Sequence, residues 1–388
     1  MLARDLPGRP RVTLRLERIV LREIRLPLRE PFRISSGLTT ERRIFLLELT
    51  DASGAVGWSE CVAGELPNYS AETIDTAWHA IREWVAPRVL GRSFGGPEEV
   101  APALAEDFRG HLMAKAAVEM GCWDVAARLA GVPLARLLGG TQERIPAGIS
   151  IGIQADPAAL VARAMAALAE GYRKIKMKIR PGADVAYVRA VREAAGPAAP
   201  LMADANSAYT LAEADHLAEL DAFGLTMLEQ PLGQDDLVQH AELQRRLRTS
   251  ICLDECVTSV DRARDMITLG SGRVVNIKPG RVGGFAASKA IHDLCRQHGI
   301  PVWCGGMLES GVGRAHNVAL ASLPGFTLPG DLSPSARYWG AGGDVVEPEW
   351  TMDADGMVRV PLDKPGIGVE VDAERVAALA VRTETLGA

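Results

Sequence analysis

The chain of 388 residues lacks a basic surface and a long apolar segment. Its formal net charge of −6 leaves no positive field for nucleic acid or anionic lipid. The amino terminus, "MLARDLPGRPRVTLRLERIV", alternates charged and apolar residues and contains no run typical of a signal peptide or a membrane span. We therefore expect a cytoplasmic protein that binds a small molecule, with no nucleic acid and no membrane as partner.

The sequence also lacks paired cysteines. Six cysteines are scattered without a Cys-x-x-Cys motif, which argues against a disulfide framework and favours small buried side chains. Cys252 and Cys256 flank "LDE", but no second pair of Cys or His residues lies near them in the sequence. A zinc site there is the weaker alternative.

No glycine-rich phosphate loop follows the first strand-like segment of the middle region, which argues against a doubly wound open sheet. From residue 146 onward, short apolar segments recur roughly every 23 to 28 residues, the length of a strand, a helix and two loops. Helical patterns such as "DPAALVARAMAALAEGY" and "GFAASKAIHDLCRQHG" separate them. Strand starts near 146, 174, 200, 226, 250, 274, 301 and 326 predict eight units and a closed parallel (β/α) barrel.

The regions on either side of this repeat have a different pattern. Segments such as "RIFLLELTD" and "GAVGWSECV" predict antiparallel strands, and two helical patterns follow them. We expect an α+β capping domain at 1–140, a (β/α) barrel at 141–340 and a segment at 341–388 that packs back on the capping domain.

The stretch "RKIKMKIRPG" places Lys174, Lys176 and Lys178 at alternate positions of one predicted strand. A solvated edge strand protected by lysine is the simplest interpretation. A barrel strand would instead direct these lysines into the interior, where catalytic groups gather at the carboxyl ends of the strands.

Carboxylates on the next three predicted strands favour the barrel interpretation. Asp204, Glu229 and Asp254 follow one another at steps of 25 residues, which predicts equivalent heights on adjacent strands. Two carboxylates about 4 Å apart repel by roughly 4 kcal/mol at an effective dielectric constant near 20, and a divalent cation would offset this repulsion. Oxygen ligands without His or Cys favour Mg²⁺ or Mn²⁺.

Lys278 follows the next predicted strand, in "VVNIKPGRVGG". Lys176 and Lys178 would then flank the metal on one side and Lys278 on the other. A cationic neighbourhood lowers the pKa of a lysine, so we expect these lysines to act as bases. A metal-free aldolase that forms a Schiff base through a barrel lysine is the rival, but it leaves the three acids unexplained.

This order of residues resembles the enolase superfamily in its muconate lactonizing subgroup, whose sites use a Lys or His base beside Mg²⁺. The segments "DANSAYTL", "EQPL", "NIKPGRVGG" and "PVWCGGMLESGVGRAHNVALASLP" are similar to those of o-succinylbenzoate synthases that are also N-acylamino acid racemases. The likeness runs from "EPFRISSG" to "GIGV" and implies a modified TIM barrel, an enolase-like fold, with a capping domain.

The resemblance implies a role for each matching residue. Asp204, Glu229 and Asp254 would bind Mg²⁺, Lys178 and Lys278 would transfer protons, and Lys176 would bridge the substrate carboxylate. Substrate-binding or supporting residues would be Asn206, Ser150, Phe32, Tyr69, Arg281, Met307 and Glu309. Phe32 and Tyr69 would belong to two capping loops near 31–40 and 62–70.

The implied reaction is removal of the α-proton of a small carboxylate substrate, leading to dehydration to o-succinylbenzoate for menaquinone synthesis, to racemisation of an N-acyl amino acid, or to both. The resemblance also implies a homo-oligomer. A dipeptide epimerase or a cycloisomerase of the same subgroup is the alternative. Epimerases usually have Asp-x-Asp on the last strand, where this chain has Asp331 and Ser333.

Overall fold

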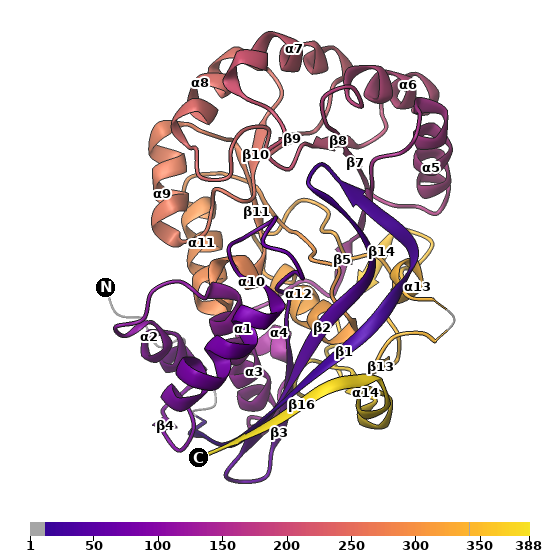
Figure 1. Ribbon diagram of the computed structural model, residues 1–388. Helices are drawn as coiled ribbons and strands as arrows, with labels where there is room; N and C mark the ends of the chain where they lie inside the picture. Colours follow the sequence, from indigo (N-terminus) through magenta and orange to yellow (C-terminus); the bar gives the residue numbers. More distant parts are fainter. Residues whose placement is uncertain (1–11, 341) are drawn as a thin grey trace.

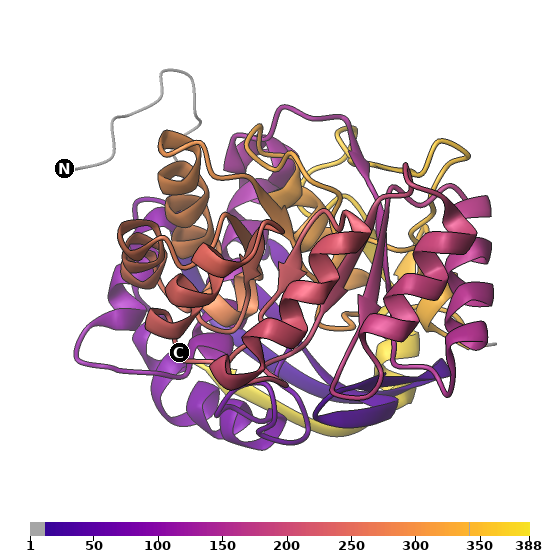
Figure 2. The same cartoon turned by 90° about the horizontal axis from the view of Figure 1, so that it is seen from above.

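The computed structural model describes residues 12–340 and 342–388 (Figure 1). The first eleven residues of the predicted capping domain, and residue 341 at the predicted start of the last segment, lie outside this range. A barrel of strands surrounded by helices lies beside a twisted antiparallel sheet that carries its own helices (Figures 1 and 2). In the described part of the chain, none of the helices has the length and apolarity needed to cross a membrane.

The antiparallel sheet has the strand order β16-β1-β2-β3, with the short β4 also paired to β1. Its strands are β1 (Leu14–Ile34), β2 (Gly37–Asp51), β3 (Val56–Cys61), β4 (Ser93–Phe94) and β16 (Ala380–Gly387). The predicted antiparallel strands are therefore confirmed. The first predicted capping loop is the tip of the long β1–β2 hairpin, where Phe32 pairs with Thr39.

The α-helices that accompany the sheet are α1 (Ile74–Ala80), α2 (Val100–Ala105), α3 (Leu112–Leu129) and α4 (Leu134–Leu138). Of these, α1 and α3 pack directly against it. α3 lies against β3 at very short range, because a Cβ atom on Gly57 would lie 2.6 Å from Val125 and one on Gly121 would lie 2.4 Å from Leu49. Two glycines therefore permit the close contact between helix and sheet.

Glu119 joins α3 to the barrel. It is fully buried, and its carboxylate accepts hydrogen bonds from the backbone N–H groups of Phe285 at 2.8 Å and Ala286 at 3.0 Å. These N–H groups begin α11 and have no partner within their own helix. The carboxylate thus fixes α3 to a barrel helix near the end of the strand that precedes Lys278.

The barrel contains seven parallel strands within the described residues, in the order β12-β11-β10-β9-β8-β7-β6. They are β6 (Gly148–Ile151), β7 (Lys174–Lys178), β8 (Leu201–Asp204), β9 (Leu228–Glu229), β10 (Ile251–Leu253), β11 (Val274–Ile277) and β12 (Val302–Cys304). The helices of the barrel region are α5 (Pro157–Ala169), α6 (Val185–Ala195), α7 (Ala214–Ala218), α8 (Val238–Arg246), α9 (Val260–Leu269), α10 (Pro279–Val282), α11 (Phe285–Gln297), α12 (Gly311–Ala321) and α13 (Ser335–Tyr338). The predicted parallel barrel is confirmed.

The eighth unit differs from the prediction, because residues 326–331 form no regular strand. Gly330 nevertheless exchanges backbone hydrogen bonds with the first strand region, through Pro146 at 3.2 Å and Gly148 at 2.6 Å. Asp331 N–H reaches Cys304 O, at the end of β12, at 2.9 Å. Pro329 lacks a backbone donor, so the ladder cannot continue along this segment, yet the segment spans the gap between β12 and β6.

The end of the chain contacts both regions. β16 pairs with β1, and α14 (Ala373–Leu379) precedes it. β14 (Met357–Arg359) pairs with β5 (Arg144–Pro146), which leads into the barrel, while β13 (Val346–Glu347) pairs with β15 (Glu370–Val371).

Candidate active site

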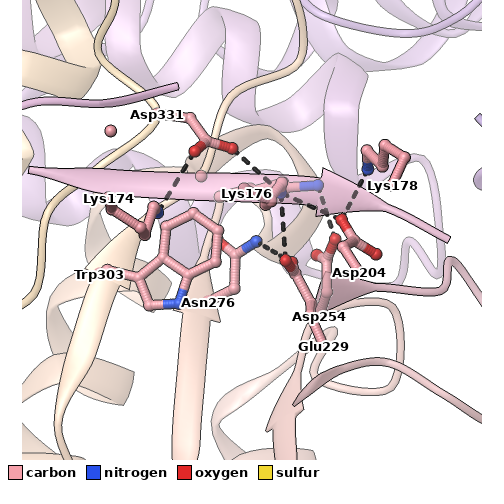
Figure 3. Close-up of polar contacts among 12 residues, drawn as sticks. Lys174, Lys176, Lys178, Asp204, Glu229, Asp254, Asn276, Trp303 and Asp331 are labelled. Carbon is pink, nitrogen blue, oxygen red and sulfur yellow. Dashed lines mark hydrogen bonds and ion pairs between the residues drawn. The ribbon is translucent and has the colours of Figure 1, made fainter. Parts of the chain in front are cut away.

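The lysines of β7 point into the barrel. β7 is paired on both sides, with β6 and with β8, and Lys174, Lys176 and Lys178 are 2%, 2% and 8% exposed. The edge-strand interpretation is therefore wrong. Three lysines share the interior because side chains at alternate positions of a strand point to the same face (Figure 3).

Three acids lie next to these lysines, on a slant across the barrel. Lys178, Asp204 and Glu229 are level in the backbone register, but the partner of Glu229 on β10 is Cys252, two residues before Asp254. The predicted equal height therefore holds for two acids and is wrong for Asp254. Strands in a barrel are staggered, and a step of two residues keeps the side chain on the same face.

The lysines of β7 bind the first two acids directly. Lys176 Nζ lies 3.1 Å from both Asp204 Oδ2 and Glu229 Oε2 (Figure 3). Lys178 Nζ donates to Asp204 Oδ2 and to Asn206 Oδ1, each at 2.6 Å. On its other side, Glu229 Oε1 accepts from Asn276 Nδ2 at 2.6 Å.

The third acid belongs to a second cluster across the barrel. Lys278 Nζ donates to Asp254 Oδ2 at 2.6 Å and to the Tyr69 hydroxyl at 3.2 Å. Tyr69 in turn donates to Asp254 Oδ1 at 2.8 Å, and Arg281 binds the same carboxylate. Tyr69, from the second predicted capping loop, therefore reaches the barrel interior, although it lies 185 positions before Asp254 in the sequence.

The ionisation of the lysines departs from the prediction. Burial opposes the charged form of Lys176, but Asp331, Glu229 and Asp204 outweigh it and raise the pKa well above the ordinary lysine value. Lys278 is also buried, and the neighbouring Asp254 raises its pKa. The expected lowering of these pKa values is wrong for this arrangement, because each ammonium lies against carboxylates.

The same contacts shift the pKa values of Asp204 and Glu229 in opposite directions. Burial opposes ionisation of Asp204, but the ammonium groups of Lys178 and Lys176 hold its pKa well below the usual range. Burial and the nearby Asp204 raise the pKa of Glu229. The pKa shifts of the two acids are therefore opposite, although both carboxylates contact Lys176. Asp204 has a second ammonium partner, Lys178, which Glu229 does not contact.

The acids suit a hard divalent cation by their donor chemistry. Asp204, Glu229 and Asp254 are fully buried oxygen donors, and an ammonium already bridges the first two as a stand-in cation. In residues 12–340 and 342–388, no cluster of three His, Cys, Asp or Glu side chains is arranged so that it could hold a metal ion, since the acids here face lysines. Metal binding would require these lysines to give up part of their contacts.

A cavity of about 340 Å³ lies over this site, between the barrel and the capping residues. Lys178 and Lys278 both line it, as do Asn206, Phe32, Tyr69, Met307 and Leu308. Glu309 does not line the cavity. Its carboxylate turns inward, accepting from Met307 N and from Asn317 Nδ2, both at 2.8 Å, so it supports the pocket loop from behind.

Ser150 lies on β6 beside Lys176 in the backbone register. Its hydroxyl is buried, with no hydrogen-bond partner among the described residues. The substrate-binding or supporting role of Ser150 stays a prediction.

Further residues lie in the site besides the predicted catalytic and metal-binding set. Lys174 and Asp331 form an ion pair next to Lys176, and Trp303 packs against both lysines (Figure 3). Glu255, which follows Asp254, accepts from Asn206 Nδ2 at 3.1 Å. The alternation in "RKIKMK" predicts that Lys174 faces the barrel interior. Its ion pair with Asp331 joins residues far apart in the chain, so no local sequence pattern predicts it.

The fold and the site define a class: a barrel enzyme with a capping domain, in which two opposed lysines line a cavity above buried acids. The amino-terminal region, residues 17–139, matches the mandelate racemase / muconate lactonizing enzyme N-terminal domain, and residues 159–376 match the enolase C-terminal domain-like family. The chain belongs to the mandelate racemase / muconate lactonizing enzyme family of the enolase superfamily.

Two curated relatives illustrate the similarity. The chain is 48% identical to an o-succinylbenzoate synthase of Geobacillus stearothermophilus, covering 94% of this chain and 96% of the relative. It is also 48% identical to an N-succinylamino acid racemase of Thermus thermophilus, covering 92% and 95%. Among solved structures, an enolase superfamily member of Listeria innocua has a TM-score of 0.92 and 39% identity, covering 96% of this chain and 99% of that one.

Proposed function

We propose that this protein is an o-succinylbenzoate synthase, an N-succinylamino acid racemase, or an enzyme with both activities, and that it requires Mg²⁺, with Mn²⁺ as a substitute. The observation that carries the proposal is the pair of lysines, Lys178 and Lys278, that line one cavity above buried acids. The equal similarity to relatives with each name supports a site that serves both reactions.

The two lysines stand across the barrel from each other, because β8, β9 and β10 lie between their strands. We assign Lys178 and Lys278 to proton transfer at the two faces of the substrate α-carbon and Lys176 to the substrate carboxylate. Asp204, Glu229 and Asp254 would hold Mg²⁺. When bound, this ion would stabilise negative charge on the substrate carboxylate as a Lewis acid.

The charges of the site favour a substrate with two carboxylates. Within the site, the buried carboxylates and the buried cationic groups are equal in number. The acids are Asp204, Glu229, Asp254, Glu255 and Asp331, and the cations are Lys174, Lys176, Lys178, Lys278 and Arg281. A divalent cation would add two uncompensated positive charges to this set, and a dicarboxylate would neutralise them. The substrate of the synthase and N-succinyl amino acids are both dicarboxylates.

The remaining assignments belong to this proposal. Phe32 and Tyr69 would close over the substrate, Asn206, Arg281 and Ser150 would support the site, and Met307 with Glu309 would shape the pocket loop. The capping domain would span 1–140, the barrel 141–340 and the final segment 341–388. The protein would act in the cytoplasm as a homo-oligomer, without nucleic acid or membrane partners, and the synthase activity would serve menaquinone synthesis.

An assay of the purified protein against both substrates tests the proposal. We expect dehydration, racemisation of an N-succinyl amino acid, or both, with activity lost after chelation and restored by Mg²⁺ or Mn²⁺. Inactivity toward both substrates, or full activity in a chelated and metal-free sample, would contradict it. Borohydride trapping in the presence of chelator would reveal the Schiff-base alternative.

A further inference from the structure

Lys174 has no place in the proposed reaction, because it lies at the start of β7 and does not line the cavity. Its Nζ is buried 3.3 Å from the centroid of the Trp303 ring and 3.3 Å from Asp331 Oδ1. Among the described residues, this Nζ has no hydrogen-bond partner. A buried ammonium needs a compensating charge, and Asp331 supplies it, with the Trp303 ring face adding a favourable contact.

The other oxygen of Asp331 binds a residue that does belong to the site. Asp331 Oδ2 lies 3.0 Å from Lys176 Nζ (Figure 3). Lys176 therefore contacts carboxylates on two sides: Asp331 on one side, and Asp204 with Glu229 on the other. Asp331 comes from the irregular segment that closes the barrel, where its backbone N–H bonds Cys304 O.

A divalent cation would affect the carboxylates on the two sides of Lys176 differently. Under the proposed function, on which this inference rests, the cation would neutralise Asp204 and Glu229 and repel the Lys176 ammonium. Asp331 is not among the proposed ligands, so it would remain an anion beside that ammonium. Lys174 compensates part of the charge of Asp331.

We propose that Asp331 is a positioning residue that retains the ammonium of Lys176 when a divalent cation occupies Asp204 and Glu229. Without a metal, Lys176 itself acts as the counter-cation of the two acids. With a metal, the ammonium is kept beside Asp331, where it remains available to a substrate carboxylate.

Calorimetric titration of the full chain, stripped of divalent ions, with Mg²⁺ and Mn²⁺ tests this inference. Asp331→Asn should raise the Kd of the metal at least about tenfold, because Lys176 then has no anion to receive it. Lys174→Met should lower the Kd by roughly threefold or more, because one positive charge leaves the neighbourhood while Asp331 keeps its full charge. Opposite effects exclude simple structural damage, which would weaken binding in both variants.

Asp344→Asn provides a matched control, because Asp344 is a buried carboxylate that accepts from Gly311 N and the Ser335 hydroxyl outside the site. Its metal Kd should equal that of the wild type. If Asp331→Asn does not fold, the double variant Lys174→Met/Asp331→Asn removes the ion pair as a unit and should bind metal more weakly than Lys174→Met alone.

An unchanged Kd in Asp331→Asn, weaker binding in both single variants, or equal Kd values in the double variant and Lys174→Met would overturn the inference while the metal site stands. A wild-type protein that binds neither Mg²⁺ nor Mn²⁺ would overturn the proposed metal site, and this inference with it.

Discussion

Lys278→Ala is expected to abolish racemisation yet leave the exchange of one α-proton with solvent. Lys178 and Lys278 line the cavity from strands separated by β8, β9 and β10, so in the proposed mechanism each would reach one face of the α-carbon. Racemisation needs both lysines, whereas exchange of one enantiomer needs only the lysine on its own side. Loss of a positioned acid or base lowers a rate at least ~10²-fold, which corresponds to about 2.7 kcal/mol of barrier.

The contacts in the site indicate that the variant folds. Asp254 keeps its bonds to Tyr69 and Arg281 when Lys278 is removed, so no buried carboxylate is left without a partner. In the matched variant Lys178→Ala, Asp204 keeps Lys176 at 3.1 Å. Each of the two variants should therefore lose less free energy of unfolding than the roughly 3 to 5 kcal/mol that an uncompensated buried charge costs.

Proton NMR in D₂O, run separately on each enantiomer of an N-succinyl amino acid, measures this exchange. Lys278→Ala should exchange one enantiomer and Lys178→Ala the other, with thermal unfolding as the control for structure. Racemisation by Lys278→Ala at the wild-type rate would refute the two-lysine mechanism. Exchange of the same enantiomer by both variants would refute the opposed placement of the lysines.

Three further outcomes are expected. Phe32→Ala, at the hairpin tip, should change the ratio of kcat/KM between substrates more than it changes the metal Kd; equal losses on every substrate would count against a specificity role. Glu229→Gln should lose metal affinity in calorimetry but remain folded, since repulsion from Asp204 is relieved; unaltered affinity would remove Glu229 from the ligand set. Burial raises the pKa of Glu119 to about 7, so the stability it confers is present below the unfolded pKa near 4.5 and is lost as the pH rises through about 7. Denaturant unfolding should show a loss of stability over this pH range that is roughly 3 kcal/mol larger in the wild type than in Glu119→Gln; identical pH profiles would contradict it.

Much of the site could be predicted from the sequence because its parts recur with the period of the fold. A strand, a helix and two loops take about 25 residues, so acids at that spacing fall on adjacent strands. Alternation along β7 likewise puts Lys174, Lys176 and Lys178 on one face of the strand. Local patterns of this kind depend only on backbone geometry, which each short segment carries by itself.

The tertiary structure decided what these residues touch. The stagger of the barrel moved Asp254 two residues from the predicted level, and closure of the barrel placed Asp331 beside lysines more than 150 positions earlier in the chain. Docking of the capping domain brought Tyr69 onto Asp254, and the packing of the pocket loop turned Glu309 inward. Such contacts join segments far apart in sequence, and the pKa directions follow from them because a charge responds to its neighbours in space. The sequence determined the set of chemical groups and the face each occupies; the fold determined their pairing.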